Sequence, residues 1–89
     1  MSYKTTMNVA WQRESTKDIV YLKDYEQQEF IIFENVSKDI WMGIMKNLSI
    51  EDICLKICED YEISESGTIR TDVESFIQDC MENNWIEES

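Results

Sequence analysis

The order of hydrophobic and polar positions changes character near residue 35. Before it, apolar residues alternate with polar ones or form short runs, in the segments 8–15, 18–24 and 29–33. Alternation and β-branched or aromatic runs between polar segments are typical of strands. After it, apolar residues recur every three or four positions, as in amphipathic helices. The pattern therefore predicts three strands followed by three helices.

The segment "EFIIF" differs from the two strands before it. In "NVAWQRES" Val9, Trp11 and Arg13 alternate with Ala10 and Gln12, but in "EFIIF" the apolar run at 30–33 leaves no polar face. A strand with one wet face should alternate, so something must cover both sides. We expect one face, either Phe30 with Ile32 or Ile31 with Phe33, to pack on the core and the other to share a groove with the third helix. The alternative is that both faces are buried inside the protein.

The helix boundaries follow from capping residues. Asn35 can cap the first helix, and Ser49, with Asp52 three residues on, resembles a capping box for the second. A loop around Gly67 precedes the third helix, which should begin near Thr68 and end around residues 83–84. The apolar residues after it form a short closing strand or simply dock. We expect an N-terminal tail over residues 1–7 and one domain over residues 8–88.

Charge limits the partners that such a domain can take. The 89-residue chain has a net charge of -11, and residues 31–89 hold four basic and fourteen acidic side chains. Binding to nucleic acid depends on Lys and Arg neutralising phosphates, and no segment offers a basic stripe. Nucleic acid is therefore not expected as a partner, whereas a neutral or basic peptide is acceptable.

Catalytic and metal chemistry find little support. There is no histidine, no Gly-rich phosphate loop and no pair of nucleophile and base. Cys54 and Cys58 lie four apart, a spacing that could place two thiolates on one metal, but a zinc site needs more ligands. With Cys80 they lie on apolar stripes, as small buried hydrophobic residues do. We expect no enzyme activity, no cofactor and no metal.

The N-terminus "MSYKTTMNVAWQRE" has no apolar signal region, and no apolar run approaches the ~20 residues of a membrane span. The free cysteines suit a reducing compartment. We expect a soluble, cytoplasmic protein without a membrane partner.

The order of motifs resembles the PqqD-like family, the winged-helix peptide-binding domains also called RiPP recognition elements. The resemblance covers roughly residues 8–88. Its parts are Asn35 before a helix with Ile-Trp at 40–41, a helix ending in Tyr61, the stretch "DVESFI" at 72–77, and the apolar pair Trp85 and Ile86. Where family members often have an Asp-Gly turn after the first helix, this chain has "KNLS".

The resemblance implies an α+β fold, a winged helix-turn-helix with a three-stranded antiparallel sheet followed by three helices. It also implies a non-catalytic protein that binds the leader segment of a ribosomally made precursor peptide. The leader would add a strand to the third strand, beside the third helix, and so be presented to a modifying enzyme (protease, cyclase or radical enzyme). The peptide-binding residues are then expected to be Glu29, Phe30, Ile31, Ile32, Phe33, Arg70, Val73, Glu74 and Ile77.

Each of these expectations has an alternative. Val73 and Ile77 can belong to the core, and Arg70 can be a solvated surface residue instead of a partner for a leader carboxylate. A winged-helix DNA-binding regulator would have the same elements, although the charge argues against it. A small redox or metal protein would use the cysteines. An apolar edge strand also allows pairing with a second copy of the chain.

Overall fold

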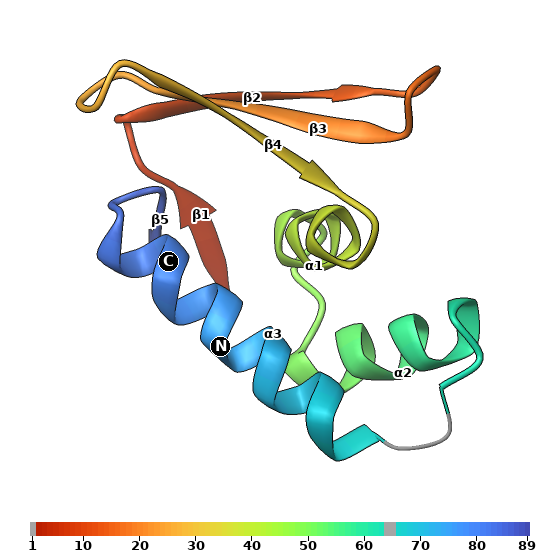
Figure 1. Cartoon of the computed structure of the whole chain (residues 1–89). Coiled ribbons are helices and arrows are strands. Elements are labelled where there is room, and N and C mark those ends of the chain that lie inside the picture. The colour runs from red at the N-terminus through yellow and green to blue at the C-terminus, as the bar shows by residue number, and fades with distance from the viewer. Residues whose placement is uncertain (1, 64–65) are drawn as a thin grey trace.

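The computed structural model describes residues 2–63 and 66–89, and in these ranges the chain forms five strands and three helices (Figure 1). In chain order they are β1 (Tyr3–Thr5), β2 (Val9–Glu14), β3 (Ile19–Asp24), β4 (Glu29–Glu34), α1 (Val36–Met45), α2 (Ile50–Asp60), α3 (Ser66–Glu82) and β5 (Ile86–Glu88). The expected α+β architecture, an antiparallel β2–β3–β4 sheet followed by helices, is confirmed. Residues 64 and 65 of the expected loop and Met1 of the expected tail lie outside the described residues.

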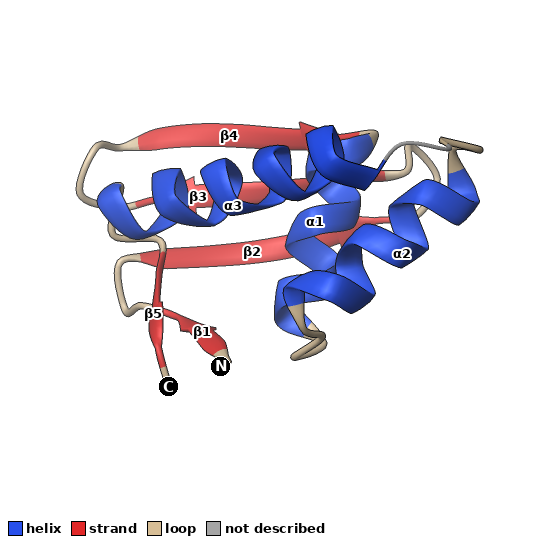
Figure 2. Cartoon of the chain, turned by 90° about the horizontal axis from the view of Figure 1, so that it is seen from below, coloured by secondary structure: helices blue, strands red, loops and turns tan. Residues whose placement is uncertain are grey.

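The β2–β3–β4 sheet has one covered and one open face. Leu22 lies opposite Trp11 on β2 and Ile31 on β4, and this row points toward the helices. The next row, in which Lys23 lies opposite Phe30, points the other way because side chains alternate along a strand. The three helices lie on the same side of the sheet (Figure 1), and seen from below α3 runs along the strand direction, next to β4 (Figure 2).

The covered face and the helices share one core. Trp41 of α1 is fully buried, and its ring lies 5.3 Å from that of Phe33 and 6.0 Å from that of Trp11. The buried members of this core are Val20, Leu22, Phe33, Ile40, Trp41, Ile44, Ile53, Cys54, Ile57, Ile69, Val73, Ile77, Cys80 and Ile86. Burial of this apolar surface is the main force that holds sheet and helices together.

The two expected helix caps differ in the structure. The Ser49 hydroxyl accepts a hydrogen bond from the Asp52 amide at 3.1 Å, which confirms its capping role. Asn35 occupies the N-cap position of α1, but its side chain makes no capping hydrogen bond. Its φ of 55° is in the left-handed region, which asparagine tolerates better than most residues. Asn35 therefore serves the turn from β4 into α1 by its backbone conformation.

The N-terminal segment expected as a tail contains a strand. Tyr3–Thr5 pairs antiparallel with Ile86–Glu88, so the closing strand foreseen as one alternative after α3 is present and has a partner. Thr6 is buried, and its hydroxyl donates to the carbonyl of Asn84 at 2.6 Å. The two ends of the chain meet here (Figure 2). No local pattern marks β1, because it is three residues long and its partner lies at the other end of the sequence.

Candidate functional site

The candidate site begins at the free edge of β4. In the β2–β3–β4 sheet, β4 pairs with β3 on one side, and among the described residues no strand pairs with its other side. Alternate residues of such an edge point backbone N–H and C=O groups away from the sheet, where another strand can bind them. The edge extends over Glu29–Glu34, six residues, which is the length of an average strand.

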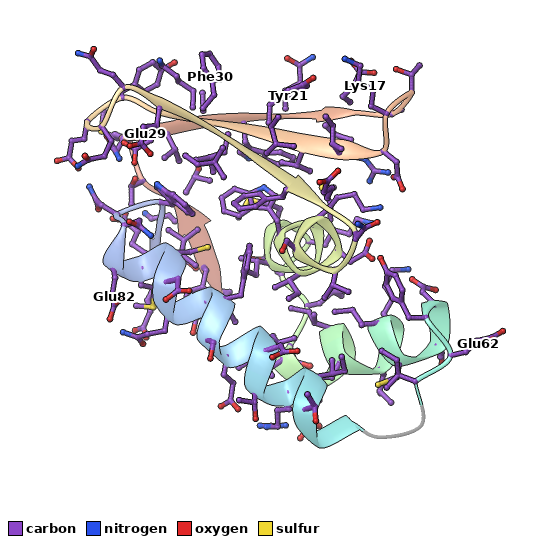
Figure 3. All side chains as sticks on the ribbon, viewed as in Figure 1. Lys17, Tyr21, Glu29, Phe30, Glu62 and Glu82 are labelled. Atoms are coloured by element: carbon purple, nitrogen blue, oxygen red, sulfur yellow. The ribbon has the colours of Figure 1, made fainter. Side chains whose placement is uncertain are left out.

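The two faces of β4 differ in burial. Phe33 is buried and Ile31 half-buried on the covered face, whereas Phe30 is 72% exposed and Ile32 is 54% exposed on the open face. Figure 3 shows Phe30, with Tyr21 of β3, pointing away from the helices. The expectation that one face packs on the core is therefore confirmed for Ile31 and Phe33, but the expectation that the other face shares a groove with the third helix is wrong. The helices all lie on one side of the sheet, so the face that contacts the core is also the face toward α3.

The wall beside β4 is formed by Phe76 of α3. Its ring centroid lies 5.2 Å from that of Phe33, in an edge-to-face arrangement, and its side chain is only half-buried. Residues four before and three after Phe76 share its helix face, and these are Asp72 and Asp79, both exposed. The helix face next to the β4 edge therefore combines one aromatic ring with two carboxylates.

The α3 residues expected at the site lie elsewhere. Val73 is fully buried and Ile77 is 5% exposed, and both belong to the core. Arg70 forms ion pairs with Glu74 at 3.7 Å and with Glu51 of α2 at 4.0 Å, on the side of α3 that faces α2. The structure thus brings Phe33 of β4 together with Phe76, whereas Arg70 and Glu74 pair with each other on the side of α3 that faces α2.

A wide apolar stripe explains the difference. In the sequence, Phe76 belongs to the same stripe as Val73 and Ile77, and spacing alone does not tell which of the three points to the core and which to the sheet edge. The signal that could have found Phe76 is its size. An aromatic ring at the margin of a helix stripe reaches further sideways than an aliphatic residue at its centre.

The charges around the edge are mostly negative. Exposed carboxylates lie at both ends of β4, on Glu29 and Glu34, and on α3 beside Phe76. The nearest cation on the sheet is Lys23 of β3, whose Nζ lies over the Phe30 ring, 4.5 Å from its centroid, on the open face. By the alternation along β4, Glu29 belongs to the covered face and Glu34 to the open face. A peptide along this edge therefore meets carboxylates on both faces and a lysine on the open face.

The cysteines do not form a second candidate site. Cys54 and Cys80 are buried, and burial raises the pKa of both thiols, that of Cys80 to about 12. A thiol that stays protonated at neutral pH is neither a good nucleophile nor a metal ligand. No cluster of three or more metal-ligating side chains occurs among the residues that the structure describes. Within the same residues, no helix is long and apolar enough to cross a membrane.

The fold and the candidate site together define a small winged helix-turn-helix domain with a free apolar strand edge beside its last helix. The chain belongs to the PqqD family: the family model described as coenzyme PQQ synthesis protein D (PqqD) matches residues 20–86. The match includes β3, β4, all three helices and the first residue of β5. The resemblance read from the sequence is thereby confirmed.

A solved structure shares the fold. It is described as TbiB1 in complex with the TbiA(beta) leader peptide, and it is 20% identical to this chain with a TM-score of 0.80. The similarity covers 97% of this chain and 96% of that one. Among the curated proteins, none matches this chain.

Proposed function

We propose that this protein binds the leader segment of a ribosomally synthesised precursor peptide and presents it to the enzymes that modify the peptide, without catalysing a reaction itself. The observation that carries the proposal is the free, apolar edge of β4 beside Phe76. Two findings support it. The chain belongs to the PqqD family, and TbiB1, which has the same fold, was solved with a leader peptide.

Strand addition is the mode of binding that this edge favours. An extended peptide that pairs with β4 satisfies unpaired main-chain groups, and alternate side chains find separate environments on the two faces. Toward the helices, the peptide would lie between Ile31 and Phe76, which are both half-buried and would lose further apolar surface to it. We therefore assign main-chain pairing to residues 29–33 and the side wall to Phe76.

The α3 part of the site is revised accordingly. Val73 and Ile77 support Phe76 from the core, so their substitution would act through the fold and not through direct contact. Arg70 and Glu74 are turned toward α2, beyond reach of a strand on the β4 edge. The carboxylates of Asp72 and Asp79 instead favour a neutral or basic side chain on the inward face of the peptide.

Binding is tested with synthetic, fluorescein-labelled peptides that cover the leader of the precursor encoded beside the gene for this protein. We expect fluorescence polarisation to give a Kd of about 1 µM or below, and a scrambled peptide to bind much more weakly. Mixing protein and full precursor should leave the mass of the precursor unchanged. Absence of binding would contradict the function, and a change in mass would contradict the non-catalytic role.

Amide hydrogen exchange tests the mode of binding separately, and the other edge strand of the sheet serves as an internal control. The sheet has two edge strands, β2 and β4, and only β4 lies beside α3 in the proposed site. We expect the peptide to slow exchange of amides in residues 29–34 and to leave those in residues 9–14 unchanged. Protection of β2, or of neither edge, would exclude addition to β4 even if the leader binds.

A further inference from the structure

The open face of the β2–β3–β4 sheet carries two large apolar side chains at the proposed docking edge. Phe30 and Ile32 are 72% and 54% exposed, and both lie on β4. Phe30 points away from the helices (Figure 3), and Ile32, two positions on, shares its face, so the contact between β4 and α3 leaves both uncovered. These two residues lie two positions apart on the same face of the edge strand, so each would have a side-chain neighbour on any strand that is added.

A lysine of β3 adjoins these side chains on the same open face. Lys23 lies directly opposite Phe30 in the register, and its Nζ lies over the Phe30 ring, 4.5 Å from the centroid. The chain has 19 acidic and eight basic residues, yet Lys23 forms no ion pair with a carboxylate of the described residues. A shallow hollow of about 170 Å³ adjoins it, between Tyr21, Phe30 and the residues of β2 at 10–12.

An added strand would come within reach of this lysine. Neighbouring strands lie about 4.8 Å apart, so a residue opposite Phe30 on the peptide is about 10 Å from the Lys23 backbone. An extended lysine side chain can cover about half of that distance, along the Phe30 ring that its Nζ already contacts. A Glu or Asp side chain on the peptide covers the rest. Lys23, Phe30 and the peptide residue then lie in one row across three strands.

The covered face of the sheet disfavours a carboxylate on the peptide. The corresponding inward row contains Asp24 opposite Glu29, and Asp72 and Asp79 lie on the adjacent face of α3. A carboxylate on the inward face of the peptide would meet like charges, whereas one on the outward face opposite Phe30 would meet Lys23. Glu34 shares the open face but lies four positions along β4 from Phe30, opposite Ile19. Charge therefore distinguishes the two faces of a docked peptide and helps to fix its register.

We propose that the open face is a second recognition surface for the same peptide. It selects a carboxylate in the row of Lys23 and Phe30, and an apolar residue two positions away in the row of Tyr21 and Ile32. The inference rests on the proposed function, and it adds the sequence pattern of the ligand. The occupant is the outward face of the peptide, and not a second protein or a second copy of the chain.

The experiment uses a phage-displayed library of random peptides about ten residues long, enough for one strand. Selection is carried out in parallel on the natural protein, on Lys23→Glu and on Lys17→Glu. Lys17 is a matched control, since its replacement changes the net charge equally but it lies at the opposite end of the sheet from Phe30 (Figure 3). Circular dichroism and thermal melting establish that both variants are folded.

We expect the natural protein and Lys17→Glu to select peptides with Asp or Glu two positions from an apolar residue. Lys23→Glu should select Lys or Arg at the acidic position. The best peptide from the natural protein, labelled with fluorescein, should bind Lys23→Glu about two- to fivefold more weakly than Lys17→Glu, the size expected for one exposed charge pair. Replacing its acidic residue by Gln should abolish this difference between the two variants.

The outcomes separate the two proposals. If peptides are enriched but Lys23→Glu keeps the acidic preference of the natural protein, the second recognition surface is excluded and peptide binding stands. The same holds if the selected peptides carry no acidic position. If the natural protein enriches no peptide above an unrelated acidic protein, the proposed function itself fails, and the inference fails with it.

Discussion

At the scale of single residues, Gly43 shows how closely α1 approaches α2. A Cβ added at Gly43 would lie 2.7 Å from Cγ1 of Ile53, a buried side chain of α2 that would have to shift. We expect Gly43→Ala to lower the free energy of unfolding by about 1–3 kcal/mol, the usual result of overpacking a core. Urea denaturation followed by tryptophan fluorescence measures the change.

The control for this substitution is Gly67→Ala, in the first turn of α3. No atom lies within 4 Å of a Cβ at that position. Alanine is the better helix former by up to about 1 kcal/mol, so this variant should be as stable as the natural protein or slightly more stable. If both variants were equally stable, the close approach of α1 and α2 would be contradicted.

Asp24 gives the fold a dependence on pH. The residue is buried, and its carboxylate accepts hydrogen bonds from the Trp85 indole at 2.8 Å and from the Gln27 amide and the Asn8 side chain, each at 3.0 Å. These hydrogen bonds, led by that from Trp85, hold the pKa of Asp24 below its ordinary value. Stabilisation by the charged form is therefore present above the unfolded pKa of about 3.9 and is lost as the pH falls through the folded pKa.

We expect Asp24→Asn to be less stable than the natural protein at pH 7, because an amide is a weaker acceptor than a carboxylate. The difference should shrink as the pH is lowered, since the natural protein then loses the charge as well. Urea denaturation of both proteins across the acid range measures this. An exposed carboxylate at the end of α2 provides the control Asp60→Asn, and equal effects of the two substitutions would contradict the role of Asp24.

At the scale of elements, β4 has no polar alternation in its sequence but a sharp alternation in its burial. Its two phenylalanines lie three positions apart, on opposite faces of the sheet. The covered face holds Phe33, which contacts the rings of Trp41, Phe76 and Trp85 at 5.2–5.9 Å. The open face holds Phe30. One strand thus contributes to the core with one face and leaves the other to solvent or to a partner.

Alanine substitutions of the two phenylalanines test this assignment. Phe33→Ala should lower the free energy of unfolding by about 3–5 kcal/mol, because it removes a ring from the centre of the core. Phe30→Ala should change it by about 0.5 kcal/mol or less, as is usual for exposed positions. Urea denaturation of both variants measures these changes, and a large loss of stability in Phe30→Ala would mean that the open face is covered.

The order of the strands and helices could be predicted from the sequence, and their residues agree closely with the structure. The Ser49 cap was also predictable, because a hydroxyl three residues before an acidic one is a local signal. The burial of the α3 residues proposed for the site was not predictable in the same way. Val73, Ile77 and Phe76 satisfy the same helical spacing, and only the packing of α3 against both α2 and β4 separates the core positions from the margin.

At the scale of the whole molecule, charge separates this domain from other winged helices. The net charge is -11, and the eight basic residues do not gather on one helix. Of these residues, Lys38 is buried in ion pairs with Asp18 at 2.9 Å and Asp39 at 3.4 Å, and Lys4, Arg13 and Arg70 also pair with carboxylates. The surface therefore repels phosphate, and it disfavours pairing between two copies of the chain as well.

We accordingly expect no binding to duplex DNA, even at low ionic strength, where attraction to phosphates is strongest. Electrophoretic mobility shift with a mixed-sequence duplex measures this, and a basic winged-helix protein of similar size serves as the positive control. Retention of the DNA would support the alternative function, a DNA-binding regulator, over peptide binding.

The sequence by itself determined the type and order of the main elements, the acidic surface and the composition of the core. All of these follow from local periodicity and from counting charges. Only the tertiary structure decided which face of β4 is covered, since "FIIF" is equally apolar on both faces and the side on which the helices pack sets the difference. It also decided the pairing of β1 with β5, because hydrogen bonds between the two ends of a chain leave no trace in the spacing of its residues.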